Sequence, residues 1–222
     1  YLSSYQAILF DLDDTLLDRD EAVNKMFFVI LEKCYGEVIH TSEMLKKFKE
    51  YDKKSYGYND KTKVLESFFD DFPPKYRLPR NYIQDFWNGH FPSCFSINQH
   101  TINIVNTVKR QAKVAIITNG STERQKAKII NTNLNSYFEI IIISEETGFS
   151  KPDKHIFELA LNKLNVQPEA ALFVGDDIEK DIGGCQNANI NGIWFNPHMI
   201  KNNTEIEPYA EIHSFDELLS YF

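Results

Sequence analysis

Short apolar runs that end in polar residues recur along this chain, and they constrain its fold more than any other feature. The runs span 7–10, 114–117, 139–143, 171–174 and 192–195. Runs that are apolar on both faces are typical of parallel strands covered by helices. Helical patterns lie between them, at about 98–110, 122–132, 153–164 and 179–188. This alternation predicts an α/β fold with a doubly wound parallel sheet.

A long insertion separates the first two runs. About a hundred residues lie between them, whereas a crossover between parallel strands needs only about a dozen. The inserted stretch is rich in aromatic residues and predicts helices at about 20–35, 42–55, 60–71 and 80–90. We therefore predict an α/β core made of 1–18 and 97–222, and a helical domain at 19–96 over the carboxyl end of the first strand.

Composition narrows the classes of partner. The 222 residues carry a net charge of −8, which disfavours a nucleic-acid polymer as partner. The three cysteines are widely spaced and include no CxxC pair, so a disulfide framework is not expected. Residues 1–6 lack a basic stretch followed by a long apolar one, and the run at 140–143 is too short to span a bilayer. We expect a cytoplasmic protein that does not enter a membrane.

The strongest candidate site is the acidic stretch that directly follows the first run. Asp11, Asp13, Asp14 and Thr15 stand there, and ligands of open α/β sheets bind beyond the carboxyl ends of the strands. Carboxylates packed this closely repel one another unless a cation or protons offset their charge. Taken alone, the stretch could also be a turn followed by a helix cap.

Three further polar segments follow later strands. They are Thr118-Asn119-Gly120, Ser150-Lys151-Pro152, and Gly175-Asp176-Asp177 with Asp181 five residues beyond Asp176. Because parallel strands end at one edge of a sheet, these groups are expected near the first acidic stretch.

The four segments resemble, in order, the four motifs of the haloacid dehalogenase-like hydrolases, and the match spans about two thirds of the chain. The inserted helices look like that family's C1-type cap. The run after Thr118 and the stretch 143–148 are most similar to the pyrimidine 5′-nucleotidase type, and sialic-acid-9-phosphate phosphatases share a similar second motif.

The resemblance implies a phosphomonoesterase that works through an aspartyl-phosphate. Asp11 is then the nucleophile, and Asp13 is the general acid and later the general base. Thr118, Asn119, Gly120 and Lys151 bind phosphate, with Thr118 and Lys151 also catalytic. Mg²⁺ is the implied cofactor, held by Asp11, the Asp13 backbone carbonyl and Asp176, with Asp181 and more weakly Asp177 in support.

Several alternatives remain open on sequence alone. A nucleoside 5′-monophosphate is the favoured small phosphorylated substrate, and a sugar-phosphate phosphatase or a phosphomutase is the second reading. Asp13 argues against a 2-haloacid dehalogenase, because displacing a halide needs no leaving-group acid, and against a non-catalytic phosphoacceptor. We expect Arg124 at the surface rather than at a substrate that it could reach from the start of its helix. We expect the aromatic residues Tyr56, Tyr58 and Trp87 in a core, although a nucleoside could stack on residues of this kind. Either a monomer or a homodimer is compatible with the sequence.

Overall fold

A single parallel sheet organises the part of the chain that the computed structural model describes, residues 5–222. The strand order is β3-β2-β1-β4-β5-β6, and every neighbouring pair is parallel. The strands are β1 (Ala7–Phe10), β2 (Lys113–Thr118), β3 (Ile140–Ile143), β4 (Ala171–Gly175), β5 (Asn191–Phe195) and β6 (Ala210–Ile212). The predicted α/β fold with a parallel sheet is confirmed. Residues 1–4 lie outside the described residues. They belong to the stretch 1–6, in which the sequence shows no signal-peptide pattern.

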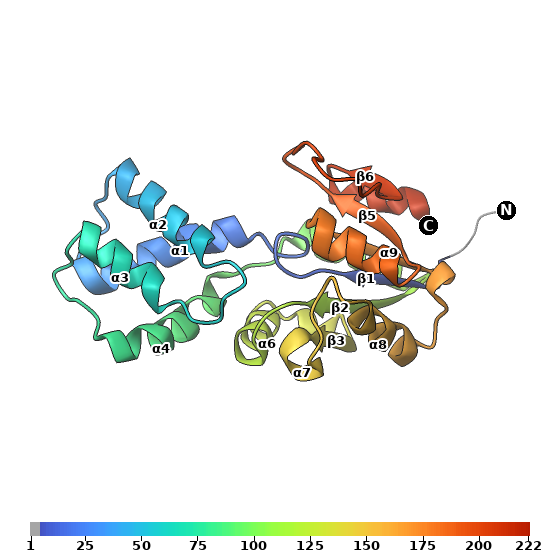
Figure 1. Cartoon of the computed structure of the whole chain (residues 1–222), viewed down its shortest axis with the longest axis horizontal. Helices are drawn as coiled ribbons and strands as arrows, with labels where there is room; N and C mark the ends of the chain where they lie inside the picture. The colour runs from blue at the N-terminus through green and yellow to red at the C-terminus, as the bar shows by residue number, and fades with distance from the viewer. Residues whose placement is uncertain (1–4) are drawn as a thin grey trace.

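Helices cover both faces of the sheet, because alternate residues of each strand point to opposite sides. Ile8 and Phe10 of β1 pack in one apolar cluster with α5 (Gln99–Lys109), with Ile129 of α6 (Thr122–Asn131), and with the 3₁₀ segment Phe215–Tyr221. Ala7 and Leu9 pack in a second cluster with α8 (Lys154–Leu164) and α9 (Gly184–Asn187). The sheet is therefore a buried middle layer, as Figure 1 shows.

The chain between β1 and α5 forms a group of helices that lies to one side of the sheet (Figure 1). The group contains α1 (Arg19–Ile30) with a π-helical turn at Leu31–Tyr35, α2 (Ser42–Lys54), α3 (Thr62–Asp71) and α4 (Arg80–His90). These bounds follow the helical patterns of the sequence closely. The position of the predicted domain boundaries, at 19 and 96, stays a prediction.

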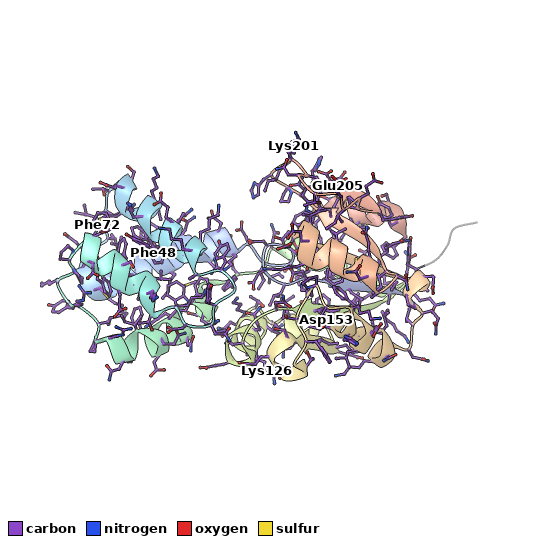
Figure 2. All side chains as sticks on the ribbon, viewed as in Figure 1. Phe48, Phe72, Lys126, Asp153, Lys201 and Glu205 are labelled. Atoms are coloured by element: carbon purple, nitrogen blue, oxygen red, sulfur yellow. The ribbon has the colours of Figure 1, made fainter. Side chains whose placement is uncertain are left out.

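Aromatic side chains hold the inserted helices together. The ring centroid of Phe48 lies 5.6 Å from that of Phe27, 5.6 Å from that of Phe68 and 6.2 Å from that of Trp87. All four side chains are fully buried, and packed rings of this kind add stability beyond their buried area. Figure 2 shows Phe48 inside this group, whereas Lys126 and Lys201 lie at the surface of the rest of the molecule.

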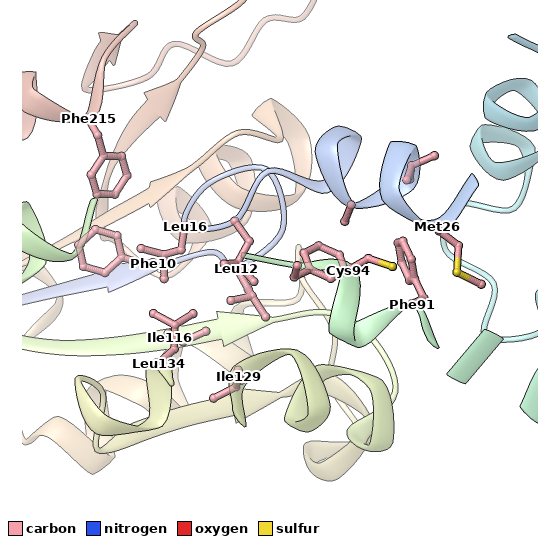
Figure 3. Close-up of a cluster of buried hydrophobic side chains, with 14 of the residues drawn as sticks. Phe10, Leu12, Leu16, Met26, Phe91, Cys94, Ile116, Ile129, Leu134 and Phe215 are labelled. Atoms are coloured by element: carbon pink, nitrogen blue, oxygen red, sulfur yellow. The ribbon is translucent and has the colours of Figure 1, made fainter. Parts of the chain in front are cut away.

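One apolar cluster runs from the sheet into the inserted helices. Phe10, Leu12 and Leu16 lead from β1 toward Met26 and Phe91 (Figure 3). The loop between them turns sharply at Asp14, whose φ of 61° lies in the left-handed region that few side chains other than Asn and Asp adopt. The acidic loop after β1 is thus fixed by buried neighbours on both sides.

Three features differ from the expected pattern. β6 and the segment Phe215–Tyr221 were not predicted, and the helix expected at 179–188 begins as a π-helical turn, Ile178–Gly183, before α9. A strand of three residues at the sheet edge carries too short a pattern to be recognised. None of the helices in the described part of the chain is both long and apolar enough to cross a bilayer.

Candidate active site

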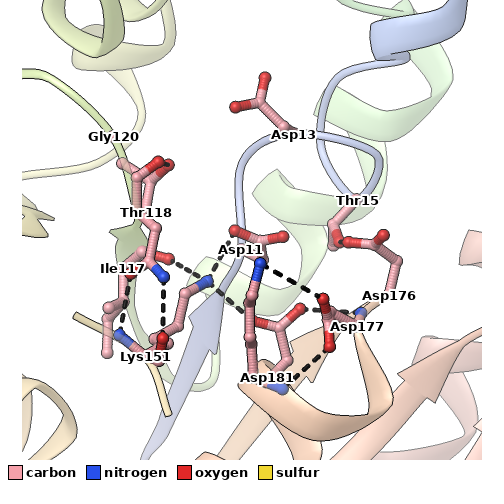
Figure 4. Close-up of polar contacts among 12 residues, drawn as sticks. Asp11, Asp13, Thr15, Ile117, Thr118, Gly120, Lys151, Asp176, Asp177 and Asp181 are labelled. Carbon is pink, nitrogen blue, oxygen red and sulfur yellow. Dashed lines mark hydrogen bonds and ion pairs between the residues drawn. The ribbon is translucent and has the colours of Figure 1, made fainter. Parts of the chain in front are cut away.

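The four polar segments meet at the carboxyl edge of the sheet. Asp11 follows β1, Thr118 ends β2, and Asp176 follows β4 (Figure 4). The register explains the meeting, because Phe10 of β1 is paired with Ile116 of β2 and with Val174 of β4. Each polar residue therefore leaves the sheet at nearly the same height.

Lys151 lies at the centre of this group and is buried. Its Nζ is 2.7 Å from Asp11 Oδ1 and 2.7 Å from Asp181 Oδ1, and it donates a hydrogen bond to the Ile117 carbonyl at 2.9 Å. Burial acts to lower the pKa of Lys151, but the carboxylates of Asp11 and Asp181 outweigh it and raise that pKa above its ordinary value. Lys151 is therefore a permanent cation in the site.

Asn119 positions Lys151. Its side-chain Oδ1 accepts from the Lys151 backbone N–H at 2.9 Å, and its Nδ2 donates to the Lys151 carbonyl at 2.9 Å. This pair of bonds ties the segment after β3 to the segment after β2. The side chain of Asn119 is thereby committed to the protein, which leaves its backbone for a substrate.

Three carboxylates converge beside Lys151. Oxygens of Asp11, Asp176 and Asp181 all lie within 4.8 Å of one another. Burial and the charges of Asp11 and Asp181 raise the pKa of Asp176 to about 10, and burial together with Asp11 raises that of Asp181 to about 7. With Lys151 as the single cation beside them in the described part of the chain, the three carboxyl groups therefore cannot all be ionised at neutral pH unless a further cation binds.

Gly175 makes the position of Asp181 possible. A Cβ at residue 175 would lie 2.4 Å from the Asp181 carboxyl carbon, so a larger residue would displace that carboxylate.

Asp177, expected as a weaker support of the metal, caps a helical turn in this structure. Its side chain accepts hydrogen bonds from the backbone N–H groups of Glu179 and Lys180 in the turn that follows.

Asp13 faces the inserted helices and is held by two side chains of α6. Lys128 Nζ lies 3.1 Å from each Asp13 carboxylate oxygen, and Gln125 Nε2 donates to Asp13 Oδ2 at 3.0 Å. Burial acts to raise the pKa of Asp13, but Lys128 and Gln125 outweigh it and hold that pKa below its usual range. Asp13 is therefore ionised in this structure.

Gln125 also connects Asp13 to the candidate phosphate-binding loop. Its Nε2 donates to Thr118 Oγ1 at 2.6 Å, and a Cβ at Gly120 would lie 3.0 Å from Gln125 side-chain carbons. Gly120 has φ of 144°, and its N–H donates to Ser144 Oγ at 3.0 Å. The loop is closely packed against α6.

A cavity of about 800 Å³ opens above these residues, and both the sheet edge and the inserted helices line it. The residues from the inserted helices and their loops include Arg19, Tyr56, Tyr58 and Lys61, and α6 contributes Arg124 and Lys128. The volume suits a small metabolite rather than a polymer.

Comparison with known proteins identifies the fold family. A family model described as haloacid dehalogenase-like hydrolase matches residues 8–195. The chain belongs to this family. The resemblance predicted from the four motifs is therefore confirmed, and the family match runs from β1 to the end of β5 and includes the inserted helices.

Relatives of this haloacid dehalogenase-like hydrolase are named for different activities. Pyrimidine 5′-nucleotidase YjjG of Escherichia coli is 29% identical over 95% of this chain and 95% of its own. A glyceraldehyde 3-phosphate phosphatase of Methanothermobacter thermautotrophicus is 27% identical over 96% of this chain and 99% of its own. These names agree with the predicted enzyme class, a phosphatase.

A solved structure supports the fold. The HAD-hydrolase YfnB from Bacillus subtilis, in a crystal form bound to magnesium, superposes with a TM-score of 0.81 at 24% identity, covering 97% of each chain. At this identity the likeness concerns the architecture, which both proteins share from the sheet to the inserted helices.

The site of this family member differs in part from the sequence-based expectations. Arg124 is buried rather than at the surface, because its guanidinium donates to the backbone and side chain of Asn59. Tyr56 and Tyr58 are exposed, whereas Trp87 lies in the core as predicted.

Three further residues of the site escaped sequence reasoning: Lys61, Gln125 and Lys128. For two of them the sequence carries a signal. Arg124, Gln125 and Lys128 fall on one face of a helix that begins directly after Thr118-Asn119-Gly120. A polar helix face that starts at a strand end points back toward the site at that end.

Proposed function

We propose that this protein is a Mg²⁺-dependent phosphomonoesterase that forms an aspartyl-phosphate on Asp11. The arrangement around Asp11 carries the proposal: its carboxylate is paired with the cation of Lys151 at 2.7 Å and lies within 4.8 Å of the carboxylates of Asp176 and Asp181. A carboxylate in this position can attack phosphorus, provided that positive charge offsets the repulsion between two anions.

The donor set fits Mg²⁺. A hard divalent cation prefers carboxylate and carbonyl oxygens, and burial together with the neighbouring carboxylates raises the pKa values of Asp176 and Asp181, which a bound cation would lower. Asp11, Asp176 and the Asp13 carbonyl would hold the ion, with Asp181 in support. When bound, Mg²⁺ offsets the charge of the phosphate and polarises its oxygens.

The first half-reaction transfers the phosphoryl group to Asp11. An Asp11 carboxylate oxygen bonds to phosphorus while the bond from phosphorus to the leaving oxygen breaks. Asp13 would give that oxygen a proton. Because Lys128 keeps Asp13 ionised in this structure, Asp13 must take up a proton before this step.

The second half-reaction releases phosphate. Asp13, ionised again, accepts a proton from a water molecule whose oxygen bonds to phosphorus, and the bond from phosphorus to Asp11 breaks. Lys151 stabilises the carboxylate of Asp11 as it leaves, since their charged atoms lie 2.7 Å apart. Thr118 and the backbone of Asn119 would orient the phosphate oxygens.

The inserted helices would act as the cap that selects the leaving group. They line the cavity together with the sheet edge, and closure over a substrate excludes bulk water. Nucleoside 5′-monophosphates are the substrate class that we favour. The relative YjjG is named for this activity, and Tyr56 and Tyr58 are exposed at the cavity, where a base could stack.

A sugar phosphate is the second candidate substrate. The relative from Methanothermobacter is named a glyceraldehyde 3-phosphate phosphatase and covers nearly the whole chain.

Phosphate release from a panel of esters, with Mg²⁺ and with EDTA, tests the proposal. The panel holds uridine 5′-monophosphate, adenosine 5′-monophosphate, ribose 5-phosphate and glyceraldehyde 3-phosphate, with 2-chloropropionate as a halide control. We expect Mg²⁺-dependent phosphate release, and an absence of phosphate from every ester would contradict it.

A further inference from the structure

Four cationic side chains line the part of the cavity formed by the inserted helices and α6. Two of them are paired with acids. Arg19 forms two hydrogen bonds to the buried carboxylate of Asp52, at 2.6 and 3.0 Å, and Lys128 is paired with Asp13. The other two cations are Lys61 and Arg124.

Lys61 and Arg124 are buried, and their hydrogen bonds go to uncharged acceptors. Their relative exposures are 6% and 9%, and within residues 5–222 neither forms an ion pair. Lys61 Nζ donates to the carbonyl and hydroxyl oxygens of Ser55 at 2.8 and 3.0 Å. Arg124 donates to the carbonyl and side-chain oxygens of Asn59.

Two buried cations without an acidic partner are unfavourable unless an anion binds to them. Burial and the neighbouring cations outweigh the charge of Asp52 and lower the pKa of Lys61 to about 8. Burial and Arg19 likewise outweigh the charges of Glu123, Glu145 and Asp13 and lower the pKa of Arg124. Glu145 is near Arg124, but it is exposed and its carboxylate accepts from the Thr122 N–H at 2.6 Å. Buried charges in proteins are normally paired, so this pair predicts an anionic ligand.

The position of the pair points to the leaving group of the substrate. Asp13, which would protonate the leaving oxygen, is held by Lys128, and Arg124 lies one helical turn before Lys128 on the same face of α6. The carboxylates of Asp176 and Asp181 lie beside Asp11 at the sheet edge, away from the side chain of Asp13 (Figure 4).

We propose that Lys61 and Arg124 bind a second acidic group, a carboxylate or a phosphate, on the leaving-group part of the substrate. This inference rests on the proposed phosphomonoesterase activity and narrows its substrate class. It favours phosphate esters of hydroxy acids, and, among nucleotides, those that carry an acidic base or a second phosphate.

Two pairs of esters that differ only in one acidic group test the inference. In 3-phosphoglycerate a carboxylate replaces the hydroxymethyl group of glycerol 3-phosphate, and orotidine 5′-monophosphate adds a carboxylate to uridine 5′-monophosphate. The readout is the ratio of kcat/KM for the acidic ester to kcat/KM for its neutral partner, measured with Mg²⁺. The wild-type protein is expected to favour the acidic member by about 10- to 100-fold, the strength of a charge-assisted hydrogen bond.

The variants Lys61→Met and Arg124→Met should lower this ratio toward one, mainly by raising KM for the acidic ester, and Arg124→Lys should restore part of it. Matched controls are Lys63→Met and Arg110→Met, since both side chains are exposed. We expect the controls to keep the wild-type ratio. Circular dichroism of each variant checks that it is folded.

Two results would overturn the inference alone: Mg²⁺-dependent hydrolysis with no preference for the acidic esters, or equal losses for acidic and neutral esters in the variants. Equal losses would mean that the two cations serve the transferred phosphate. If none of the four esters is hydrolysed, the proposed function fails and the inference fails with it.

Discussion

Asp176→Asn is expected to make the metal-free protein more stable while it removes the response to Mg²⁺. The new side chain has nearly the same shape, and its Oδ1 can still accept the hydrogen bond that Thr15 Oγ1 gives to Asp176 at 3.1 Å. What changes is the charge. Without a metal, the carboxylate of Asp176 is buried beside those of Asp11 and Asp181, which raises its pKa from 3.8 to about 10.

The free-energy difference follows from that pKa. An acid whose pKa is raised by folding adds no penalty below the pKa of the unfolded chain, and its penalty grows as pH rises toward the pKa of the folded state. Between pH 3.8 and pH 7, the raised pKa of Asp176 therefore lowers the free energy of unfolding by about 4 kcal/mol at most. Because Asp176 is partly exposed and shares its charge with two neighbours, we expect a gain of about 1–3 kcal/mol for Asp176→Asn.

Thermal unfolding in EDTA measures this gain. For a chain of this size the expected rise in Tm is about 3–10 °C at pH 7, and at pH 5 it should shrink to less than half. Added Mg²⁺ should raise the Tm of the wild-type protein and have much less effect on Asp176→Asn. The control is Asp153→Asn, the same substitution at the exposed N-cap of α8. A less stable variant in EDTA, or an undiminished response to Mg²⁺, would refute the reasoning.

Three further substitutions have distinct expected outcomes. Asp11→Asn should fold normally but lose at least about a thousandfold in kcat, because an amide is not a nucleophile; steady-state phosphate release near the wild-type rate would contradict this. Arg19→Met should lower the free energy of unfolding by about 3–5 kcal/mol, since it leaves Asp52 buried and unpaired. Urea denaturation should show less than about 1 kcal/mol for Arg77→Met, whose ion pair is exposed. Gly120→Ala should cost about 1–3 kcal/mol in the same assay, because φ is 144° and Gln125 is too close, whereas Gly89→Ala in α4 should be neutral or stabilising.

The arrangement of the sheet could be predicted because one sequence pattern, an apolar run followed by a polar residue, marks both the strands and the site. The central runs of β1, β2 and β4 are buried on both faces and end in polar residues at the same edge, so the pattern of residues is enough to place Asp11, Thr118 and Asp176 together. β6 could not be recognised in this way. Its three residues pair only with β5 at the edge of the sheet, where burial leaves little pattern.

The parts of the site that depend on packing between distant segments could not be predicted. Arg124 resembles a surface residue at the start of a helix, and only the position of Asn59, 65 residues away in the chain, buries it. Lys128 resembles any lysine of an amphipathic helix until Asp13 is placed opposite it. Conversely, Tyr56 and Tyr58 are aromatic residues of the kind expected in a core, but they lie in a loop at the cavity.

The identity of the residue that receives the phosphoryl group tests the central claim most directly. In Asp13→Asn the second half-reaction loses its base, so an intermediate should persist when the variant is mixed with Mg²⁺ and a hydrolysed ester and quenched in acid. Peptide mapping by mass spectrometry should then find the phosphoryl group on Asp11, and no such label should form in the double variant that also carries Asp11→Asn. Phosphate release by the wild-type protein together with a label on another residue would contradict the account.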